Sequence, residues 1–252
     1  MHRRATRPRA ERRPHPVRYA LVMPAAGAGR RFGSSAPKQH ASLAGRSVLE
    51  WALVPFLDDP RCTALRLVLA AGDPQAPRLA PLLGARGRIV QGGEERCDSV
   101  LAGLASLEGE VGDEQWVLVH DAARPLLARA DLERLLATVD AGETGGLLAA
   151  PLADTLKVAD ADGRCAGTVP RAGLWCAQTP QMFRRGALRR ALESARATGR
   201  VPTDEAQAME WTGVGARLVA AQYCNLKVTT PADLAVAAAV LAARAGEHGG
   251  AA

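Results

Sequence analysis

A glycine-rich stretch near the start of the sequence carries residue types that suit phosphate binding. It runs from Pro24 to Gly33, follows a short apolar run and includes Arg30 and Arg31. Glycines allow backbone N–H groups to approach phosphate oxygens closely, and the arginines together with nearby Lys38 supply positive charge. The stretch lacks the Gly-Lys-Ser/Thr ending of a Walker loop. We therefore expect a wide loop that wraps a nucleoside triphosphate.

Lysine is rare in this chain, which makes its positions informative. Arginine makes up 29 of the 32 basic residues, and the three lysines are Lys38, Lys157 and Lys227. A lysine offers a compact ammonium that can rotate among several oxygens, whereas the guanidinium of arginine is a planar fork. Because arginine serves here as the ordinary surface cation, we expect the lysines to mark positions where a rotatable ammonium is needed.

The same glycines also fit the G-x-G-x-x-x-G spacing of a dinucleotide-binding loop, which would make the chain an NADP-dependent oxidoreductase. That loop requires a helix that begins inside it, whereas residues 34–37 read Ser-Ser-Ala-Pro and would interrupt the helix. A ribose-binding acid is also missing at the expected distance, because Asp58 and Asp59 come later in the chain. We keep the oxidoreductase as the alternative from a different class.

Apolar runs with strand-like and helix-like spacing alternate along most of the chain. This order is typical of βαβ units, so the sequence predicts an α/β fold with a doubly wound, mostly parallel sheet. We expect strands at 19–23, 64–70, 87–91, 116–120, 146–150, 217–221 and 225–228. We expect helices at 48–57, 75–83, 99–107, 130–139, 184–197 and 232–244.

Residues 154–175 interrupt this alternation. Two short β-like runs, 155–159 and 166–170, flank the turn-rich sequence Asp-Ala-Asp-Gly at 160–163, which predicts a protruding β-hairpin. A two-stranded hairpin by itself is only marginally stable in water. We therefore expect this arm to pack against a second subunit.

The positive charge of the chain comes from its N-terminal tail. Residues 1–18 hold seven arginines and one glutamate, which accounts for the whole net charge of +6. This segment has three prolines and few apolar side chains, so burial cannot offset the entropy that ordering would cost. We expect a disordered basic tail over 1–18, a single domain over 19–246 and a disordered C-terminus over 247–252. A nucleic-acid-binding role for the tail is a further alternative, although nucleic acid is not the partner that we expect.

Cysteine use and hydropathy indicate the compartment. The five cysteines are odd in number and form no C-x-x-C pair, so they predict buried thiols rather than a disulfide framework or a zinc site. No apolar run approaches the roughly 20 residues that span a bilayer, and the tail lacks the apolar segment of a secretion signal. We expect a cytoplasmic protein without a membrane partner.

Seven short motifs make the interpretation more specific. They are Gly-Gly-Glu-Glu-Arg-x-Asp-Ser-Val from Gly92, Val-His-Asp-Ala-Ala-Arg-Pro from Val119, Asp-Thr-Leu-Lys from Asp154, Thr-Val-Pro-Arg-x-Gly-Leu-Trp from Thr168, Gln-Thr-Pro-Gln from Gln178, Thr-Asp-Glu from Thr203 and Asn-Leu-Lys-Val-Thr from Asn225. Together with the glycine-rich loop and the Pro-Lys-Gln at 37–39, they resemble the 2-C-methyl-D-erythritol 4-phosphate cytidylyltransferases of the non-mevalonate isoprenoid pathway, which are nucleotidyltransferases with a Rossmann-like fold. The resemblance runs in order from about residue 19 to residue 240.

The resemblance implies that the chain transfers CMP from CTP to 2-C-methyl-D-erythritol 4-phosphate, which gives 4-diphosphocytidyl-2-C-methyl-D-erythritol and pyrophosphate. The substrate phosphate would attack the α-phosphorus of CTP directly. Mg²⁺ would be held mainly by the triphosphate, with Asp121 as a candidate ligand. A D-ribitol-5-phosphate cytidylyltransferase, which shares the fold and the type of reaction, is the nearest alternative.

The resemblance also implies roles for individual residues. The implied catalytic residues are Arg31, Lys38, Arg171 and Lys227, and the implied ligands of the substrate phosphate are Thr155, Arg171 and Lys227. The arm at 154–175 would carry Thr155 and Arg171 into the neighbouring site of a homodimer. Cations on both sides would let two anions meet at reacting distance. The implied CTP-binding residues are Pro24, Ala25, Ala26, Gly27, Gly29, Arg30, Arg31, Lys38, Gly93, Glu94, Ser99 and Asp121.

Several residues of the recognised motifs also fit purely structural roles. Ser99 fits a helix-start hydroxyl, and Asp121 fits a loop carboxylate that pairs with Arg124. His120 fits a packed core side chain, and Lys157 fits a surface or subunit contact as well as a catalytic role.

Two residues depart from the family pattern, and one segment allows two interpretations. The family leads us to expect aspartate in place of Glu94, and an acidic or small polar residue in place of Cys224. The Thr-Asp-Glu at 203–205 fits a substrate contact, but we expect it to cap the helix that follows.

Overall fold

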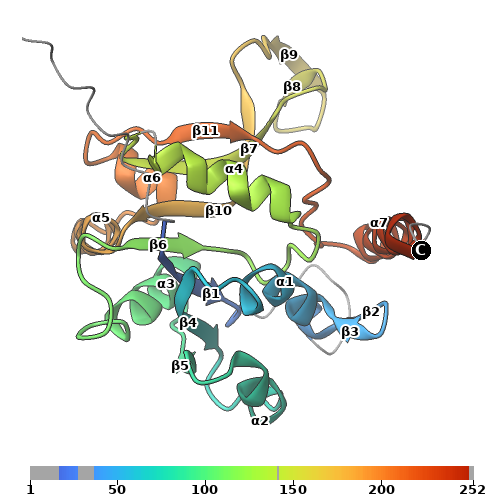
Figure 1. Ribbon diagram of the computed structural model, residues 1–252. Coiled ribbons are helices and arrows are strands. Elements are labelled where there is room, and N and C mark those ends of the chain that lie inside the picture. Colours follow the sequence, from blue (N-terminus) through green and yellow to red (C-terminus); the bar gives the residue numbers. More distant parts are fainter. Residues whose placement is uncertain (1–16, 28–36, 141, 250–252) are drawn as a thin grey trace, which may run out of the picture.

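The computed structural model describes residues 17–27, 37–140 and 142–249, and a seven-stranded sheet lies at the centre of this part of the chain (Figure 1). Its strands, in order across the sheet, are β11 (Arg217–Ala220), β7 (Gly145–Pro151), β10 (Trp175–Arg184), β6 (Trp116–Val119), β1 (Tyr19–Pro24), β4 (Cys62–Leu69) and β5 (Gly87–Gln91). Every neighbouring pair is parallel except the two that β10 forms with β6 and β7. The predicted α/β fold with a mostly parallel sheet is confirmed.

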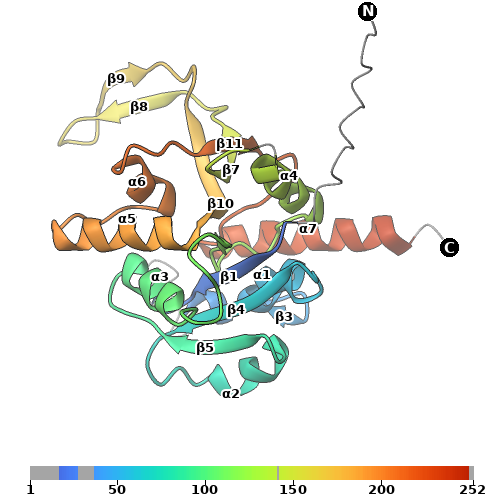
Figure 2. The same cartoon turned by 60° about the vertical axis from the view of Figure 1, so that its left-hand side comes forward.

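Helices cover both faces of the sheet (Figures 1 and 2). One face packs against α1 (Val48–Leu57), α2 (Ala76–Leu79), the 3-10 turn η3 (Ala80–Leu83) and α4 (Arg129–Asp140), and the other packs against α3 (Arg96–Ala105), α5 (Arg185–Ala197) and α6 (Glu205–Glu210). In β1, Tyr19, Leu21 and Met23 face the first set of helices, whereas Ala20 and Val22 face the second. A strand buried on both faces is apolar along its whole length, which is why β1 is recognisable in the sequence.

A smaller core lies beside the main one and includes the C-terminal helix. It joins the short hairpin of β2 (Ser42–Leu43) and β3 (Arg46–Ser47) to α7 (Pro231–Gly249) through Leu43, Val228 and Ala237. The 3-10 turn η2 (Lys38–His40) leads into this hairpin.

Two expected domain boundaries are wrong by a few residues. Helix α7 continues to Gly249, past the boundary expected at 246. Val17, which the sequence placed in the disordered tail, packs against the main core. Residues 1–16 and 250–252 of the two expected disordered segments lie outside the described residues.

The segment around residue 160 forms an arm that projects from the body (Figures 1 and 2). Strands β8 (Leu156–Ala159) and β9 (Cys165–Val169) pair antiparallel. Gly163 in the connecting turn has a φ of +76°, which favours glycine. The arm therefore has the hairpin shape that the sequence predicts.

Two expectations about strands are wrong. Strand β10 was not predicted, because Gln178, Thr179, Pro180 and Gln181 break its apolar pattern. Its register with β7 is irregular over the same stretch, between Ala177 and Gln181. Conversely, the segment 225–228 forms no strand. Its backbone bonds to the loop that follows β6 instead of to the sheet.

The cysteines differ from the expected buried thiols. Cys62 is buried and Cys97 is half-buried, whereas Cys165, Cys176 and Cys224 are exposed. Cys165 lies on the projecting arm and Cys176 at the start of β10 near the arm, where little of the chain covers them. Within the described ranges, no helix is long and apolar enough to cross a membrane.

Candidate active site

Loops that follow three parallel strands form a pocket of about 170 Å³. Residues 24–27 come at the end of β1, residues 93–99 follow β5, and residues 121–123 follow β6. The carboxyl ends of parallel strands share one edge of the sheet, which is where open α/β folds bind their ligands. The three loops therefore meet although they are far apart in sequence.

The pocket collects most of the residues that the sequence singled out. Among the predicted site residues, it is lined by Pro24, Ala25, Ala26, Gly27, Lys38, Gly93, Glu94, Ser99, Asp121 and Lys227. Gln39, Glu95, Arg96, Ala122 and Ala123 complete the lining. Gly29, Arg30 and Arg31 lie outside the described residues.

Thr155 and Arg171 are not brought to this pocket within one chain. Both are exposed on the arm, where the Arg171 guanidinium donates a hydrogen bond to the carbonyl of Ala153. Lys157 is exposed on the same arm, and its Nζ lies 2.7 Å from Oγ1 of Thr168 on the opposite strand. The arm therefore holds its polar side chains away from the pocket that its own chain forms.

Gln39 joins the first loop to the turn that carries Lys38. Its side chain is buried, and its amide nitrogen donates to the carbonyl of Ala25 at 2.8 Å and to that of Gly27 at 3.1 Å. The backbone N–H of Ala25 donates in turn to the carbonyl of Val68 in β4 at 2.7 Å. The position of Lys38 is therefore coupled to the start of the glycine-rich loop.

The second loop is tightly packed around two glycines. A Cβ atom on Gly92 would lie 2.6 Å from both Ala26 and the Ser99 hydroxyl, and one on Gly93 would lie 2.5 Å from Asp98. The buried Ser99 accepts a hydrogen bond from the N–H of Gly93 at 3.3 Å. The N-cap of α3 is Glu95, so Ser99 lies inside the first turn instead of capping the helix, and its hydroxyl holds the loop at Gly93.

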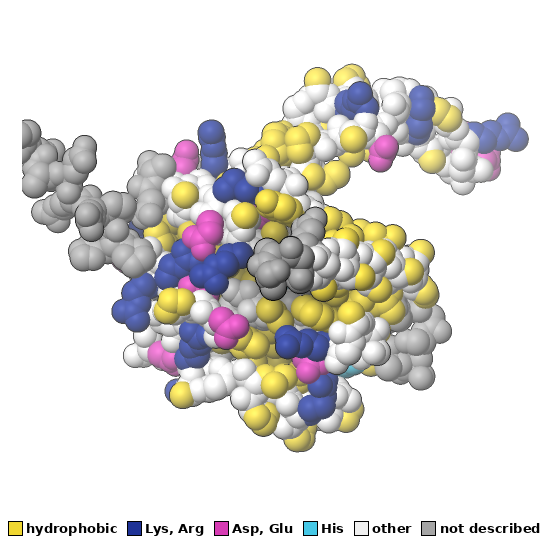
Figure 3. All heavy atoms as spheres, turned by 45° about the vertical axis from the view of Figure 1, so that its right-hand side comes forward, with side chains coloured by type: hydrophobic (Ala, Val, Ile, Leu, Met, Phe, Trp, Pro, Cys, Tyr) yellow, Lys and Arg dark blue, Asp and Glu magenta, His cyan; other side chains and the backbone are white. Residues whose placement is uncertain are grey.

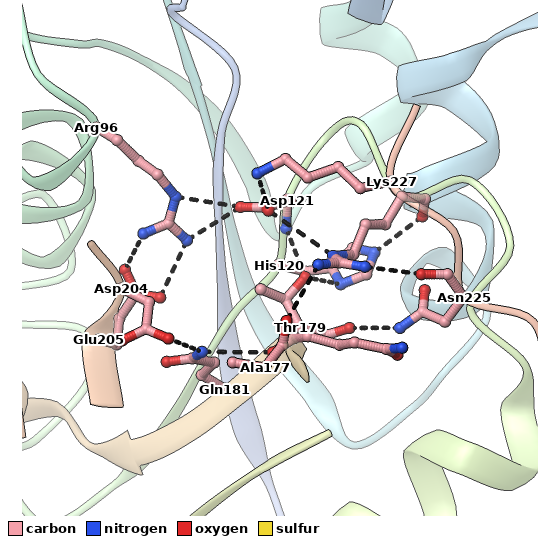
Figure 4. A network of polar contacts seen from close by, with 12 residues as sticks. Arg96, His120, Asp121, Ala177, Thr179, Gln181, Asp204, Glu205, Asn225 and Lys227 are labelled. Atoms are coloured by element: carbon pink, nitrogen blue, oxygen red, sulfur yellow. Dashed lines mark hydrogen bonds and ion pairs between the residues drawn. The ribbon is translucent and has the colours of Figure 1, made fainter. Parts of the chain in front are cut away.

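Asp121 lies at the centre of a network of charges (Figure 4). Its Oδ1 accepts from Arg96, at 3.1 Å from Nε and 3.0 Å from Nη2. Its Oδ2 lies 2.8 Å from Nζ of Lys227 and 3.8 Å from Nε of Arg124. Pairing with Arg124 was the structural role expected for Asp121, and this is the longest of the three contacts.

The charges around Asp121 keep it ionised. Burial alone would raise the pKa of Asp121, but the nearby charges of Arg96 and Lys227 hold that pKa well below its usual range. Burial would likewise lower the pKa of Arg96, whereas Glu205 and Asp121 raise it. The pocket therefore presents charged cations beside an ionised carboxylate, an arrangement that can bind phosphate groups.

His120 is linked to Asp121 through the hydroxyl of Thr179. It is fully buried, and its Nε2 lies 3.2 Å from the carbonyl of Arg124 while its Nδ1 lies 3.0 Å from Oγ1 of Thr179. A carbonyl only accepts, so Nε2 carries the proton and Nδ1 accepts from Thr179. Thr179 in turn accepts from the N–H of Asp121 at 3.0 Å. Burial lowers the pKa of His120 to about 4, so the side chain is neutral and structural, as expected.

The segment 225–228 is held so that Lys227 reaches the pocket. Asn225 donates to the carbonyl of Thr179 at 2.8 Å and accepts at its own carbonyl from Arg124 at 2.8 Å. The N–H of Val228 donates to the carbonyl of Ala123 at 2.8 Å. These bonds attach the segment to the loop after β6 on either side of Lys227.

The Thr-Asp-Glu sequence caps α6, as expected, and also reaches the network. Asp204 accepts from the N–H of Gln207 at 2.9 Å, which is an N-cap bond. Glu205, the first residue of the helix, is fully buried and binds Arg96 through both of its oxygens. This role of Glu205 was not predicted from the sequence, and neither were those of Arg96 and Gln39. The only signal for each of the three was that it lies inside a recognised motif.

The described residues hold no cluster of three His, Cys, Asp or Glu side chains that could bind a metal ion. Asp121 is the carboxylate most central to the pocket, and its two oxygens are already bound to Arg96 and Lys227. Mg²⁺ commonly binds one or two carboxylates together with substrate phosphates and water. Asp121 is therefore the described carboxylate that could contact a metal ion bound to a phosphate ligand in this pocket.

Comparison with known proteins places these features in a family. Residues 19–243 match the sequence model of the family described as 2-C-methyl-D-erythritol 4-phosphate cytidylyltransferase. The chain is 52% identical over 220 residues to the protein of that name from Ectopseudomonas mendocina (strain ymp), and the match covers 87% of this chain and 94% of that protein.

Solved structures agree. A crystal structure of 4-diphosphocytidyl-2C-methyl-D-erythritol synthase superposes with a TM-score of 0.78 at 34% identity and covers 89% of this chain and 99% of that one. The 2-C-methyl-D-erythritol 4-phosphate cytidylyltransferase of Thermus thermophilus gives a TM-score of 0.73 at 30% identity, with coverage of 88% and 97%. The chain therefore belongs to the 2-C-methyl-D-erythritol 4-phosphate cytidylyltransferase family.

Proposed function

We propose that the pocket binds CTP and that its cations bring a polyol phosphate against the α-phosphorus. As a member of its family, the chain is a cytidylyltransferase that transfers CMP from CTP to 2-C-methyl-D-erythritol 4-phosphate and releases pyrophosphate. The alternative substrate, D-ribitol 5-phosphate, is not favoured by these relatives. The observation that carries the site assignment is that the loops after β1, β5 and β6 share one pocket with Lys38 and Lys227.

The two sides of the pocket would receive different parts of CTP. The loop at 24–27 and Lys38 are placed to receive the triphosphate, because backbone N–H groups and an ammonium both bind phosphate oxygens. The loop at Gly93 and Glu94, held by Ser99, is placed to receive the base. If Glu94 acts through its main chain, the expected departure from aspartate has no consequence.

Lys227 would bind the phosphate of the second substrate. Its ammonium has three N–H donors, and Asp121 Oδ2 lies 2.8 Å from it, which leaves donors for a phosphate. An oxygen of that phosphate attacks the α-phosphorus, the bond to the β-phosphate oxygen breaks, and pyrophosphate leaves. Such transfers depend on positioning and on charge stabilisation, so no covalent enzyme intermediate is required.

Mg²⁺, when bound to the triphosphate, would neutralise part of its charge. The residues of this chain would then supply the remaining cations, with Lys38 on the CTP side and Lys227 on the side of the polyol phosphate. Arg31, outside the described residues, is proposed for the CTP side by the family resemblance.

The arm supports a homodimer in which each subunit completes the site of the other. Leu156, Val158, Val169, Leu174 and Trp175 are each more than a third exposed, and in Figure 3 hydrophobic side chains lie along the arm and at its base. A second subunit would bury this surface, since an isolated hairpin is marginally stable. Thr155 and Arg171 would then reach the partner's bound polyol phosphate.

Five free cysteines support a reducing, cytoplasmic location.

Thermal unfolding with added nucleotides tests the binding assignment. With MgCl₂ present, CTP at a hundredfold excess over its Kd should raise Tm by about 5 to 10 °C. UTP, which differs from CTP in its base, should give a smaller shift at the same concentration, and so should NADPH. A shift with NADPH but not with CTP would favour the oxidoreductase instead.

A further inference from the structure

We propose that Glu205 is a positioning residue, which orients Arg96 so that Arg96 holds Asp121 and Asp121 holds Lys227. The inference rests on the proposed role of Lys227 in binding the substrate phosphate. Four side chains of alternating charge form this row, and Figure 4 shows them running from Glu205 on α6 to Lys227 at the pocket. Glu205 lies at the far end of the row and does not line the pocket.

Arg96 contacts two carboxylates at once. Its Nη1 donates to Oε1 of Glu205 at 2.6 Å, and its Nη2 donates to Oε2 of Glu205 at 3.0 Å and to Oδ1 of Asp121 at 3.0 Å. Its Nε donates to the same Oδ1 at 3.1 Å. Only a planar fork with several donors can make these contacts together. The orientation of the guanidinium is therefore set by Glu205 and Asp121 jointly.

This arrangement gives the two carboxylate oxygens of Asp121 different partners. Arg96 binds Oδ1, so Oδ2 is directed to Lys227, whose Nζ lies 2.8 Å away. If Arg96 lost the contact with Glu205, its Nη1 would need a new acceptor in a partly buried site. Nη1 would then compete for Oδ2 of Asp121 or for an incoming phosphate, and either contact would disturb the pairing with Lys227.

Glu205 itself is held firmly in place. It is fully buried at the first position of α6, where a carboxylate is favourable because of the helix dipole. The buried Gln181 of β10 anchors this helix start, because its Nε2 donates to Oδ2 of Asp204 at 3.0 Å and its Oε1 accepts from the N–H of Ala206 at 2.8 Å. The row of charges is therefore attached to the sheet through α6 as well as through β6.

The substitution Glu205→Gln tests the inference, with Glu210→Gln as its matched control. Glu210 lies on the same helix but is exposed, so the control removes the same charge without touching Arg96. Glu205→Gln should raise KM for 2-C-methyl-D-erythritol 4-phosphate about 10-fold, the effect of one weakened charged contact, and should leave kcat nearly unchanged. A purely structural role would lower Tm and the yield of active enzyme but would not move KM.

A double-mutant cycle shows whether Glu205 acts through Arg96. In an Arg96→Lys background, where the fork is absent, Glu205→Gln should change KM by less than about twofold. Independent, multiplicative effects of the two substitutions on KM would overturn the inference. This comparison also keeps the test decisive if Glu205→Gln lowers stability, because each KM is measured on folded protein.

Lys227→Ala, measured in parallel, separates this inference from the proposed function. If Lys227→Ala raises KM for the polyol phosphate but Glu205→Gln behaves like Glu210→Gln, the positioning role fails and the assignment of Lys227 stands. If Lys227→Ala leaves that KM unchanged, both the assignment and the inference fail.

Discussion

Lys227 and Asp121 lie 2.8 Å apart, Nζ to Oδ2, although they come from opposite halves of the chain. Asp121 follows the central strand β6, and Lys227 is held in a loop by Asn225 and Val228. The contact places a rotatable ammonium at the edge of the sheet where the loops after β1, β5 and β6 form the pocket. We propose that an arriving phosphate shares this ammonium with Asp121.

Replacing Lys227 should weaken binding of the polyol phosphate more than binding of CTP. Lys227→Ala removes a charged hydrogen bond, so we expect KM for 2-C-methyl-D-erythritol 4-phosphate to rise about 10- to 100-fold. Lys227→Arg keeps the charge but not the compact shape, so its KM for this substrate should lie between that of the native enzyme and that of Lys227→Ala. Steady-state kinetics with each substrate varied in turn checks this, with the exposed Arg129→Ala as a control. Equal changes in both KM values would contradict the assignment.

Replacing Lys38 should slow the transfer step itself. Lys38 lines the pocket next to the loop at 24–27, where, in the proposed reaction, charge would develop as pyrophosphate leaves. We expect Lys38→Ala to lower kcat about 10²- to 10³-fold, the size observed for loss of one preorganised donor. Single-turnover measurements with radiolabelled CTP separate this effect from product release. A turnover close to that of the native enzyme would remove Lys38 from the mechanism.

A hybrid of two variant chains tests the proposed homodimer, in which the arm of one subunit completes the site of the other. Co-expressed chains that carry Lys38→Ala and Arg171→Ala under different affinity tags should give a hybrid with one complete site, because each chain supplies what the other lacks. Its kcat should be about half that of the native dimer, whereas each parental homodimer should be nearly inactive. A hybrid no more active than its parents would show that Arg171 acts within its own chain or not at all.

Stability should fall on acidification because of His120. Burial lowers its pKa to about 4, against an ordinary value of 6.5. Between these values the unfolded chain binds a proton that the folded chain does not, so the free energy of unfolding decreases as the pH falls. We expect a loss of roughly 2 to 3 kcal/mol between pH 7.5 and 4.5 from this group.

Urea unfolding at the two pH values checks the role of His120. His120→Gln cannot titrate, so this variant should lose correspondingly less stability over the same interval, whatever its stability at pH 7.5. An identical pH dependence in the native protein and the variant would show that other groups are responsible.

The sequence allowed much of the fold to be predicted because four strands of the sheet, β1, β4, β6 and β7, are buried along most of their length. β1 and β6 are continuously apolar and β4 nearly so, and each is followed by a recognisable turn or loop. β10 escaped prediction because its polar middle serves the site: Thr179 binds His120 and Gln181 anchors α6. Local patterns do not reveal a strand whose side chains are selected for such long-range contacts.

The site could be predicted in part for a similar reason. Lys38 and Lys227 stood out by rarity, and Asp121 by its position after a strand. The roles of Arg96 and Glu205 depend on a contact between α3 and α6, which no local spacing indicates. The arginine-rich composition also hid Arg96 among many surface cations.

Pyrophosphate release by the native enzyme tests the central claim most directly. With CTP and Mg²⁺, 2-C-methyl-D-erythritol 4-phosphate should support rapid release, whereas D-ribitol 5-phosphate should support little at the same concentration. UTP in place of CTP should also be a poor donor. Rapid release with D-ribitol 5-phosphate and none with 2-C-methyl-D-erythritol 4-phosphate would contradict the account.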